Sequence, residues 1–279
     1  MKQGDGHGQV VVIGGAEDRD GEAEILREFV RLAGGAKARI SIIAAASENA
    51  SEIAASYSEV FQRLGAARAH DLKILSRKDA DSAEAVAAVE RASGVFFTGG
   101  NQVRITRTLG GTRLDTVLHK RHAEGLVLAG TSAGAAMMSS VMIMGGPPVS
   151  TLRAGGVELG PGMEFVPGVL IDQHFEERGR LRRLLSAVAQ HPHDIGLGID
   201  EDTAAVVSGH SLGVIGAGTV TIIDAGHLTY TNLNELEKDE LLAICGVRIH
   251  VLPAGYRFDL QNREPVLGAR SSDCEGVDI

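Results

Sequence analysis

One serine of the sequence stands in a pattern that suits covalent catalysis. Ser132 lies at the centre of GTSAG (residues 130–134), which fits the pattern Gly-x-Ser-x-Gly. In this pattern a buried strand turns sharply into a helix, which exposes the serine and offers it free backbone amides for an oxyanion. An aliphatic run precedes Ser132 and a helix-forming run follows it. We predict that Ser132 is a nucleophile; the alternative is a buried strand that needs small residues where it enters a helix.

A serine nucleophile needs a base that accepts its proton. Of the ten histidines we select His174, which follows the aliphatic residues 168–171 and precedes a charged segment of helical character. His174 would then stand at the carboxyl end of a strand, the same topological position as Ser132. The alternative is a purely structural histidine, whose polar atoms are satisfied at the start of a helix.

The base must in turn be oriented by a third group. Three consecutive carboxylates, Asp200, Glu201 and Asp202, follow another aliphatic stretch. Burying all three is costly because like charges repel and each loses its hydration, so at least one should have a partner. Alternation along a strand would place Glu201 on the face opposite the other two, which leaves both choices open. The alternative is a solvated turn without a role.

Two backbone amides are candidates for the oxyanion hole. One belongs to Ala133, and the other lies in TGGNQ (residues 98–102), where we select Gly100. The resulting order of serine, histidine and acid differs from the serine, acid, histidine order of the α/β-hydrolases. A plain esterase is therefore disfavoured.

The elements that must position these residues alternate along the first half of the chain. Four aliphatic runs, QVVVIGG, RISIIAAAS, GVFFTGG and GLVLAGT, are separated by segments of helical periodicity such as GEAEILREFVRLAGG and SEIAASYSEVFQRLGA. This alternation predicts an α/β fold with a mainly parallel sheet flanked by helices, which binds ligands at the carboxyl ends of its strands. Residues from about 203 to 265 are rich in β-branched residues and predict antiparallel strands. We expect one domain over residues 1–279, with this β-rich extension as part of it.

Composition narrows the classes of function. The net charge of −9 disfavours binding to nucleic acid, which requires a concentrated basic surface. The two cysteines, Cys245 and Cys274, lack the spacing of metal ligands and form no disulfide framework. No apolar run reaches the length of a signal peptide or of a membrane span. We expect a cytoplasmic protein without metal, cofactor or membrane contact.

Five segments together carry a family resemblance. GGAEDR, FFTGGNQVRI, GTSAGAAMMS, DQHFEERGRLRRL and GIDEDTAAVV, in this order and spacing, resemble the cyanophycinases, a branch of the serine peptidase family that also contains aspartyl dipeptidase. The resemblance covers about residues 10–207. It implies a fold like that of class I glutamine amidotransferases, a flavodoxin-like three-layer sandwich, in a protein that forms a homodimer and needs no metal.

The resemblance also implies an activity. The expected protein is a serine-type exopeptidase that hydrolyses cyanophycin, an aspartate polymer with arginine on each side-chain carboxyl, to β-aspartyl-arginine dipeptides. Ser132 would be the nucleophile, His174 the general base and Glu201 the orienting acid. It is the resemblance, and not the spacing, that selects Glu201 over its neighbours.

Polar and charged residues around these positions suit such a substrate. One or two of the arginines after His174 would clamp its carboxylates, since guanidinium pairs with carboxylate in a bidentate way. Helical periodicity would bring Arg178 and Arg182, or Arg180 and Arg183, onto a common face of a helix. The alternative for each arginine is an ion pair at the surface without a role in binding. Asp172 is the candidate for the substrate guanidinium. The predicted substrate-binding residues are Asn101, Gln102, Asp172, Gln173, Arg178, Arg180 and Arg183.

Two other functions remain open. One is a peptidase similar to aspartyl dipeptidase, acting on short peptides. The other is a binding protein that keeps the fold without catalysis, which an intact Ser132, His174 and Glu201 disfavour.

Overall fold

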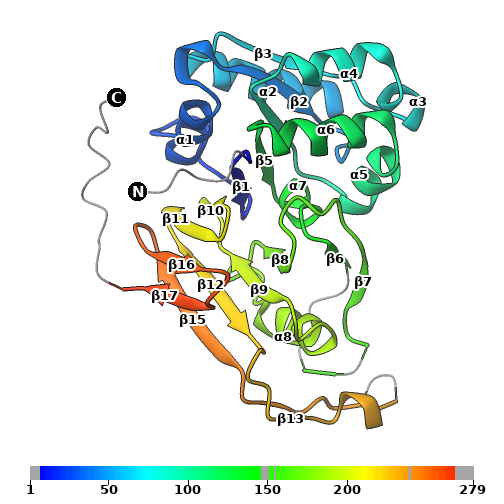
Figure 1. Ribbon diagram of the computed structural model, residues 1–279, viewed down its shortest axis with the longest axis vertical. Coiled ribbons are helices and arrows are strands. Elements are labelled where there is room, and N and C mark those ends of the chain that lie inside the picture. The colour runs from blue at the N-terminus through cyan, green and yellow to red at the C-terminus, as the bar shows by residue number, and fades with distance from the viewer. Residues whose placement is uncertain (1–6, 146–150, 154, 238–239, 268–279) are drawn as a thin grey trace.

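A nine-stranded sheet forms the centre of the protein in the computed structural model, which describes residues 7–145, 151–153, 155–237 and 240–267 (Figure 1). In spatial order its strands are β17 (Glu264–Val266), β16 (Arg257–Asp259), β11 (Ser211–Gly216), β10 (Thr203–Ser208), β1 (Val10–Ile13), β5 (Val127–Thr131), β4 (Gly94–Phe97), β2 (Arg39–Ile43) and β3 (Arg68–Asp71). The five strands from β1 to β3 are parallel, and β10 pairs with β1 in the antiparallel direction.

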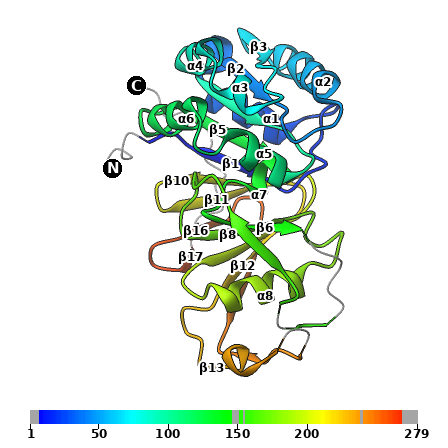
Figure 2. The same cartoon turned by 90° about the vertical axis from the view of Figure 1, so that its right-hand side faces the viewer.

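Helices cover both faces of the parallel half, as Figure 2 shows. Along β1, Val11 and Ile13 belong to the same core cluster as Phe29 of α1 and Phe61 of α2. The alternate residues of β1 belong to the core cluster of the opposite face, which α4, α5 and α6 cover. The helices are α1 (Glu24–Leu32), α2 (Ala50–Arg63), α3 (Arg77–Ala80), α4 (Ala83–Glu90), α5 (Gln102–Leu109), α6 (Arg113–Ala123), α7 (Ala133–Ala136) and α8 (Leu181–Gln190), with short 3-10 turns at Gly35–Lys37 and Leu233–Glu235. The prediction of a mainly parallel sheet flanked by helices is confirmed.

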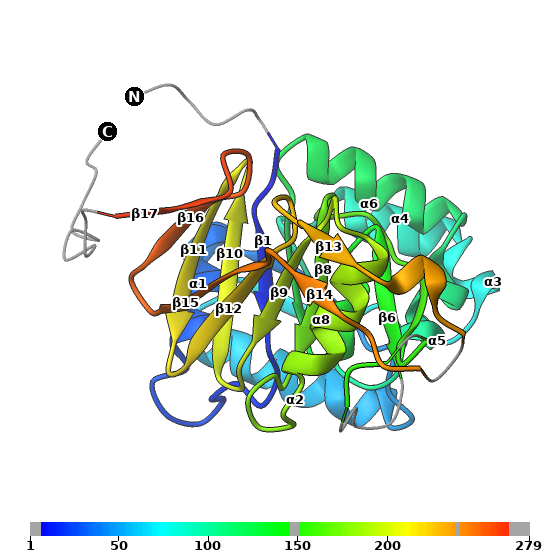
Figure 3. The same cartoon turned by 90° about the horizontal axis from the view of Figure 1, so that it is seen from below.

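A second, four-stranded sheet lies beside the first. Its strands, in order, are β15 (Arg248–Pro253), β12 (Thr219–Asp224), β9 (Ile195–Ile199) and β8 (Val169–Gln173). Only β8 and β9 are parallel, and α8 packs on the outer face of this sheet (Figure 3). Two hairpins complete the fold, formed by β6 (Val141–Gly145) with β7 (Glu158–Pro161) and by β13 (Tyr230–Thr231) with β14 (Ile244–Cys245).

The β-rich extension contributes to both sheets. Its first strands, β10 and β11, continue the main sheet, whereas β12 and β15 join the second one. The predicted antiparallel strands are confirmed by their pairing. Within this extension, the segment VRIHVLPAGYRFDL (residues 247–260) forms two strands, β15 and β16, separated by a turn.

One strand of the main sheet escapes sequence analysis. The four residues of β3, Arg68–Asp71, are polar except for one alanine, so they lack the aliphatic run that marks the other parallel strands. This polarity fits the position of β3 at the edge of the sheet.

Cys245 is an exposed free thiol, and Cys274 lies outside the described residues. None of the helices in the described ranges is long and apolar enough to cross a membrane.

Candidate active site

Ser132 occupies a sharp turn between β5 and α7. Its φ of 53° is in the left-handed region, which a residue with a side chain adopts only under strain. The two glycines of the motif permit the turn by close packing. A Cβ at Gly130 would collide with the carbonyl oxygen of Gly134, and one at Gly134 would collide with that of Phe97. The small residues around Ser132 are thus required by the backbone that presents it.

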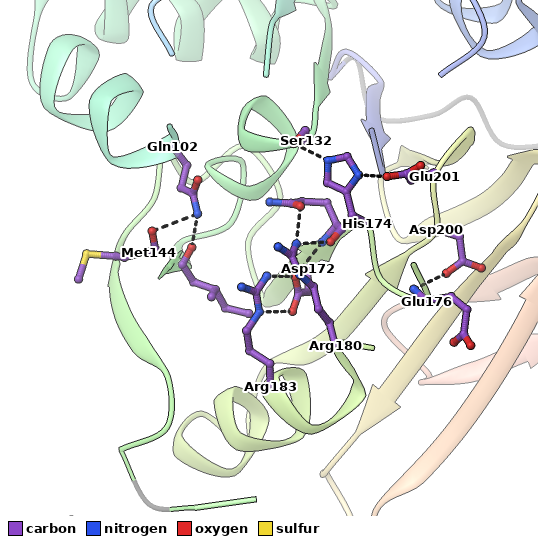
Figure 4. Close-up of polar contacts among 12 residues, drawn as sticks. Gln102, Ser132, Met144, Asp172, His174, Glu176, Arg180, Arg183, Asp200 and Glu201 are labelled. Atoms are coloured by element: carbon purple, nitrogen blue, oxygen red, sulfur yellow. Dashed lines mark hydrogen bonds and ion pairs between the residues drawn. The ribbon is translucent and has the colours of Figure 1, made fainter. Parts of the chain in front are cut away.

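Ser132, His174 and Glu201 form a continuous chain of hydrogen bonds (Figure 4). The Oγ of Ser132 lies 2.9 Å from Nε2 of His174, and Nδ1 of His174 lies 2.5 Å from Oε1 of Glu201. His174 is buried, while Glu201 keeps about a third of its side chain exposed. A histidine held on one side by a carboxylate, with its other nitrogen on a serine hydroxyl, is the geometry of an activated nucleophile.

The end of β1 holds the three segments that carry this chain. The carbonyl of Ile13 accepts from the Ser132 amide at 3.0 Å, and that of Gly14 accepts from the His174 amide at 2.8 Å. The carbonyl of Gly15 accepts from the amide of Asp202 at 2.9 Å. A Cβ at Gly15 would also collide with the His174 ring. Two consecutive glycines after the first strand mark this loop in the sequence, but their role depends on contacts with residues more than 100 positions away.

The three consecutive carboxylates have three different partners. They form a turn between β9 and β10, two strands of different sheets, so the expected alternation along a strand is wrong. Asp200 accepts from the backbone amides of Glu176 and Thr219, at 3.2 and 3.0 Å, and from the Thr219 hydroxyl, whereas Asp202 accepts from the amide of Asp18. Only Glu201 of the three reaches His174.

A cavity of about 440 Å³ opens on one side of Ser132. We call it the arginine cavity. Gly100 lines it next to the serine. Six of the seven residues predicted to bind substrate also line it: Asn101, Gln102, Gln173, Arg178, Arg180 and Arg183.

Asp172 is the exception, and the structure assigns it a different position from the one expected. Its side chain is fully buried and pairs with two arginines (Figure 4). Arg183 donates from Nε to Oδ2 at 2.8 Å and from its Nη2 to Oδ1, while Nη1 of Arg180 lies 3.3 Å from Oδ1. A carboxylate enclosed in this way is unavailable to a substrate guanidinium. Asp172 instead fixes the two cations that line the cavity.

The arginines do not all lie on one helix. α8 begins only at Leu181, so Arg178 and Arg180 belong to the turn between His174 and the helix, which sequence periodicity treats as helical. Arg180 and Arg183 nevertheless meet at Asp172, as one of the two predicted pairings requires. Burial lowers the pKa of Arg180 to about 10, which still leaves it charged at neutral pH. Arg178 is exposed.

The amide side chains of the cavity are partly committed to the protein. Oδ1 of Asn101 caps α5 by accepting from the backbone amides of Val103 and Arg104. Nε2 of Gln102 donates to the carbonyls of Ile143 and Met144 in β6 at 2.8 and 3.2 Å. Oε1 of Gln173 accepts from Arg180 at 2.6 Å. These contacts fix the wall of the cavity.

Of the two predicted oxyanion donors, Ala133 follows Ser132 directly in the chain, and Gly100 lines the arginine cavity together with Ser132. The Ala133 amide is the first of α7, where an amide has no acceptor within the helix. Gly100 has a φ of 138°, and a Cβ there would collide with the carbonyl of Ala46. Gly99 also lies close to the serine, because a Cβ on it would lie 3.4 Å from the Cβ of Ser132.

Ser132 also lines a second cavity, of about 240 Å³. We call it the Glu17 cavity. It is lined by Ser132 and His174 together with Glu17, Arg19 and Tyr57. Sequence analysis selects none of these last three residues. Two signals are present: Glu17 and Arg19 follow a predicted strand, where ligands bind in this class of fold, and both lie in GGAEDR, one of the five segments that carry the resemblance.

Comparisons with known proteins agree with this geometry. Residues 10–215 match the family described as Peptidase family S51. The chain is 43% identical to a cyanophycinase of Nostoc sp. over 91% of its length and 86% of that protein. It is 40% identical to a cyanophycinase of Geminocystis herdmanii over 93% of its length and 96% of that protein.

Solved structures give the same result for the fold. A peptidase from an acI-B1 Actinobacterium superposes with a TM-score of 0.67 at 25% identity, over 92% of this chain and 98% of that one. A peptidase E protein from Listeria monocytogenes EGD-e superposes with a TM-score of 0.55 at 15% identity, over 76% of this chain and all of that one, which shows the fold alone.

Proposed function

We propose that this chain, which belongs to peptidase family S51 and is a serine peptidase, hydrolyses cyanophycin to β-aspartyl-arginine dipeptides as an exopeptidase. The observation that carries the proposal is the chain of hydrogen bonds from Glu201 through His174 to Ser132, the serine that also lines the arginine cavity. Relatives named cyanophycinase, about 40% identical over most of their length, support the choice of polymer.

The reaction is acyl transfer. Nε2 of His174 accepts the proton of Ser132 as Oγ attacks an aspartyl backbone carbonyl, and Glu201 keeps the imidazole in the required orientation. The Ala133 amide and an amide of the Gly99–Gly100 turn donate to the oxyanion. His174 then returns the proton to the leaving amine, and water hydrolyses the acyl-enzyme through the same base.

The arginine cavity suits the acidic part of the substrate. Arginine attached through its α-amino group keeps a free α-carboxylate, so the polymer presents carboxylates along its length. Arg178 is exposed, while Arg180 and Arg183 are held in place by Asp172. Guanidinium groups fixed in this way can form bidentate pairs with carboxylates without further ordering of their side chains.

Release of dipeptide from purified cyanophycin tests the proposal. The wild-type protein should release β-aspartyl-arginine, and Ser132→Ala should lower the rate by at least about 10⁴-fold because the nucleophile is lost. Circular dichroism and the thermal midpoint of both proteins control for folding. Turnover of aspartyl dipeptides without polymer cleavage would replace cyanophycin by short peptides as the substrate. Inactivity of the wild type on both would favour the binding protein.

Two further properties of the protein follow from the resemblance and the sequence. We propose that it acts as a homodimer in the cytoplasm. Sedimentation of the purified chain measures its oligomeric state, and fractionation of the source cells measures its location.

A further inference from the structure

Glu17 is a buried carboxylate beside the nucleophile that the reaction above does not use. It is 5% exposed and lines the Glu17 cavity together with Ser132 and His174. Its Oε1 accepts from the Tyr57 hydroxyl, and its Oε2 accepts from Oγ1 of Thr131 at 2.5 Å. The carboxylate is therefore held in one orientation at the wall of the cavity.

The partners of Glu17 are hydroxyls and not cations. No ion pair within 4.0 Å involves Glu17 in the part of the chain that the structure describes. Burial raises the pKa of Tyr57, and the charge of Glu17 raises it further, so the phenol remains a neutral donor. A buried carboxylate is costly without a cation, and two hydroxyls occupy only two of its roughly four acceptor positions. The remaining positions suit a planar, bidentate cation.

The position of His174 tells which part of the substrate enters this cavity. His174 lines the Glu17 cavity but not the arginine cavity, although Ser132 lines both. In serine peptidases the imidazole that took the proton from the serine passes it to the leaving amine. The leaving group must therefore lie on the side of His174, in the Glu17 cavity.

Arg19 gives this cavity a second charge of opposite sign. It is half-buried, and its guanidinium carbon lies 5.2 Å from the centroid of the Tyr57 ring. An arginyl unit joined through its α-amino group also carries two charges, the guanidinium and the free α-carboxylate. The cavity thus offers a carboxylate and a guanidinium to a group that presents one of each.

We propose that the Glu17 cavity is the subsite for the arginyl side chain of the leaving unit, with Glu17 binding its guanidinium. This inference rests on the proposed function for the identity of the substrate. It makes Glu17 a determinant of specificity for a cationic, planar side chain next to the scissile bond.

Oligomers of three β-aspartyl-arginine units test the inference. Acetylation of the amino terminus leaves guanidinium groups as the only cations of the substrate. One oligomer carries arginine throughout, and another carries citrulline, a neutral isostere, in the unit that leaves. The wild-type protein should prefer the arginyl oligomer by about 100-fold in kcat/KM, and Glu17→Gln should reduce that preference to less than about fivefold. A third oligomer, with citrulline on the acyl side only, should be discriminated equally by both proteins.

Three controls separate charge from architecture. Glu22→Gln makes the same charge change in the same loop at an exposed residue outside the cavity, and should keep the preference for arginine. Tyr57→Phe removes one of the two hydroxyls that orient Glu17 but keeps the carboxylate, and should lower the preference for arginine less than Glu17→Gln does. Labelling of Ser132 by a fluorophosphonate, which carries no guanidinium, reports whether each variant assembles its nucleophile. A preference for arginine that persists in Glu17→Gln, or that is absent from the wild type, would overturn the inference.

The inference and the proposed function fail in different ways. A wild-type protein that releases no dipeptide from cyanophycin contradicts the proposed function whatever the behaviour of Glu17→Gln. Calorimetric binding of the arginyl and citrullinyl oligomers to Ser132→Ala, with and without Glu17→Gln, then tests the subsite without any turnover. Equal affinities for the two oligomers in Ser132→Ala would contradict the inference alone.

Discussion

The two cavities that meet at Ser132 differ in the charge that each leaves for a ligand. Two of the arginines that line the arginine cavity are bound by one fully buried carboxylate, Asp172, and the exposed Arg178 also lines this cavity. In the Glu17 cavity, a buried carboxylate is held only by hydroxyls. The contrast shows how a buried carboxylate with a structural role can be distinguished from one that is available to bind a ligand. Asp172 is already neutralised by the protein, whereas Glu17 is not.

After the loss of the serine itself, the largest loss of activity is expected when Glu201, which orients the general base, is changed. Glu201→Gln should lower kcat/KM by about 10³- to 10⁴-fold, because the imidazole loses the carboxylate that orients it. The factor should be the same for arginyl and citrullinyl oligomers, since neither cavity is altered. Steady-state kinetics with the arginyl and the citrullinyl oligomers measure the two values of kcat/KM. Glu176→Gln, an exposed neighbour, is the control. A loss smaller than tenfold would contradict the role of Glu201.

A change at Asp172 should affect the arginine cavity alone. Asp172→Asn leaves two guanidinium groups close together without their counter-charge, so the free energy of unfolding should fall by about 3 to 5 kcal/mol. Urea denaturation measures this, with the exposed Asp20→Asn as control. The folded fraction should show a higher KM but an unchanged preference for arginine over citrulline. A lost preference would mean that the two cavities are not independent.

The smallest effect is expected at the exposed arginine. Arg178→Gln should raise KM by about tenfold without changing kcat, because it removes one charge contact made equally in the bound substrate and the transition state. The effect should shrink at high salt, which screens exposed charges. Arg182→Gln, also exposed but outside the cavity, is the matched control. An equal rise in KM for both variants would indicate a general charge effect and not a contact.

Several elements of the protein can be predicted from local sequence. The aliphatic runs give β1, β2, β4 and β5, and helical periodicity gives α1 and α2, because both depend on neighbours along the chain. The same logic misses β3, whose polar residues suit only an edge strand, and places a helix over Arg178 and Arg180, where the chain forms a turn.

The sequence by itself determined the serine turn and its chemistry. Gly130 is required by its contact with Gly134 inside the motif, so this part of the pattern contains its own physical reason, whereas Gly134 is required by the carbonyl of Phe97 on β4. It also determined that His174 follows a strand, which places it at the correct edge of a sheet.

Only the tertiary structure decided how the charged residues are used. Asp172 lies near the end of the buried strand β8, and Glu17 lies in the loop after the buried strand β1, and neither position tells what the carboxylate binds. Their roles depend on partners brought in from elsewhere in the fold: arginines from α8 and its preceding turn for Asp172, and hydroxyls from α2 and β5 for Glu17. The availability of a charge depends on what surrounds it in space, and that is fixed only when distant segments pack together.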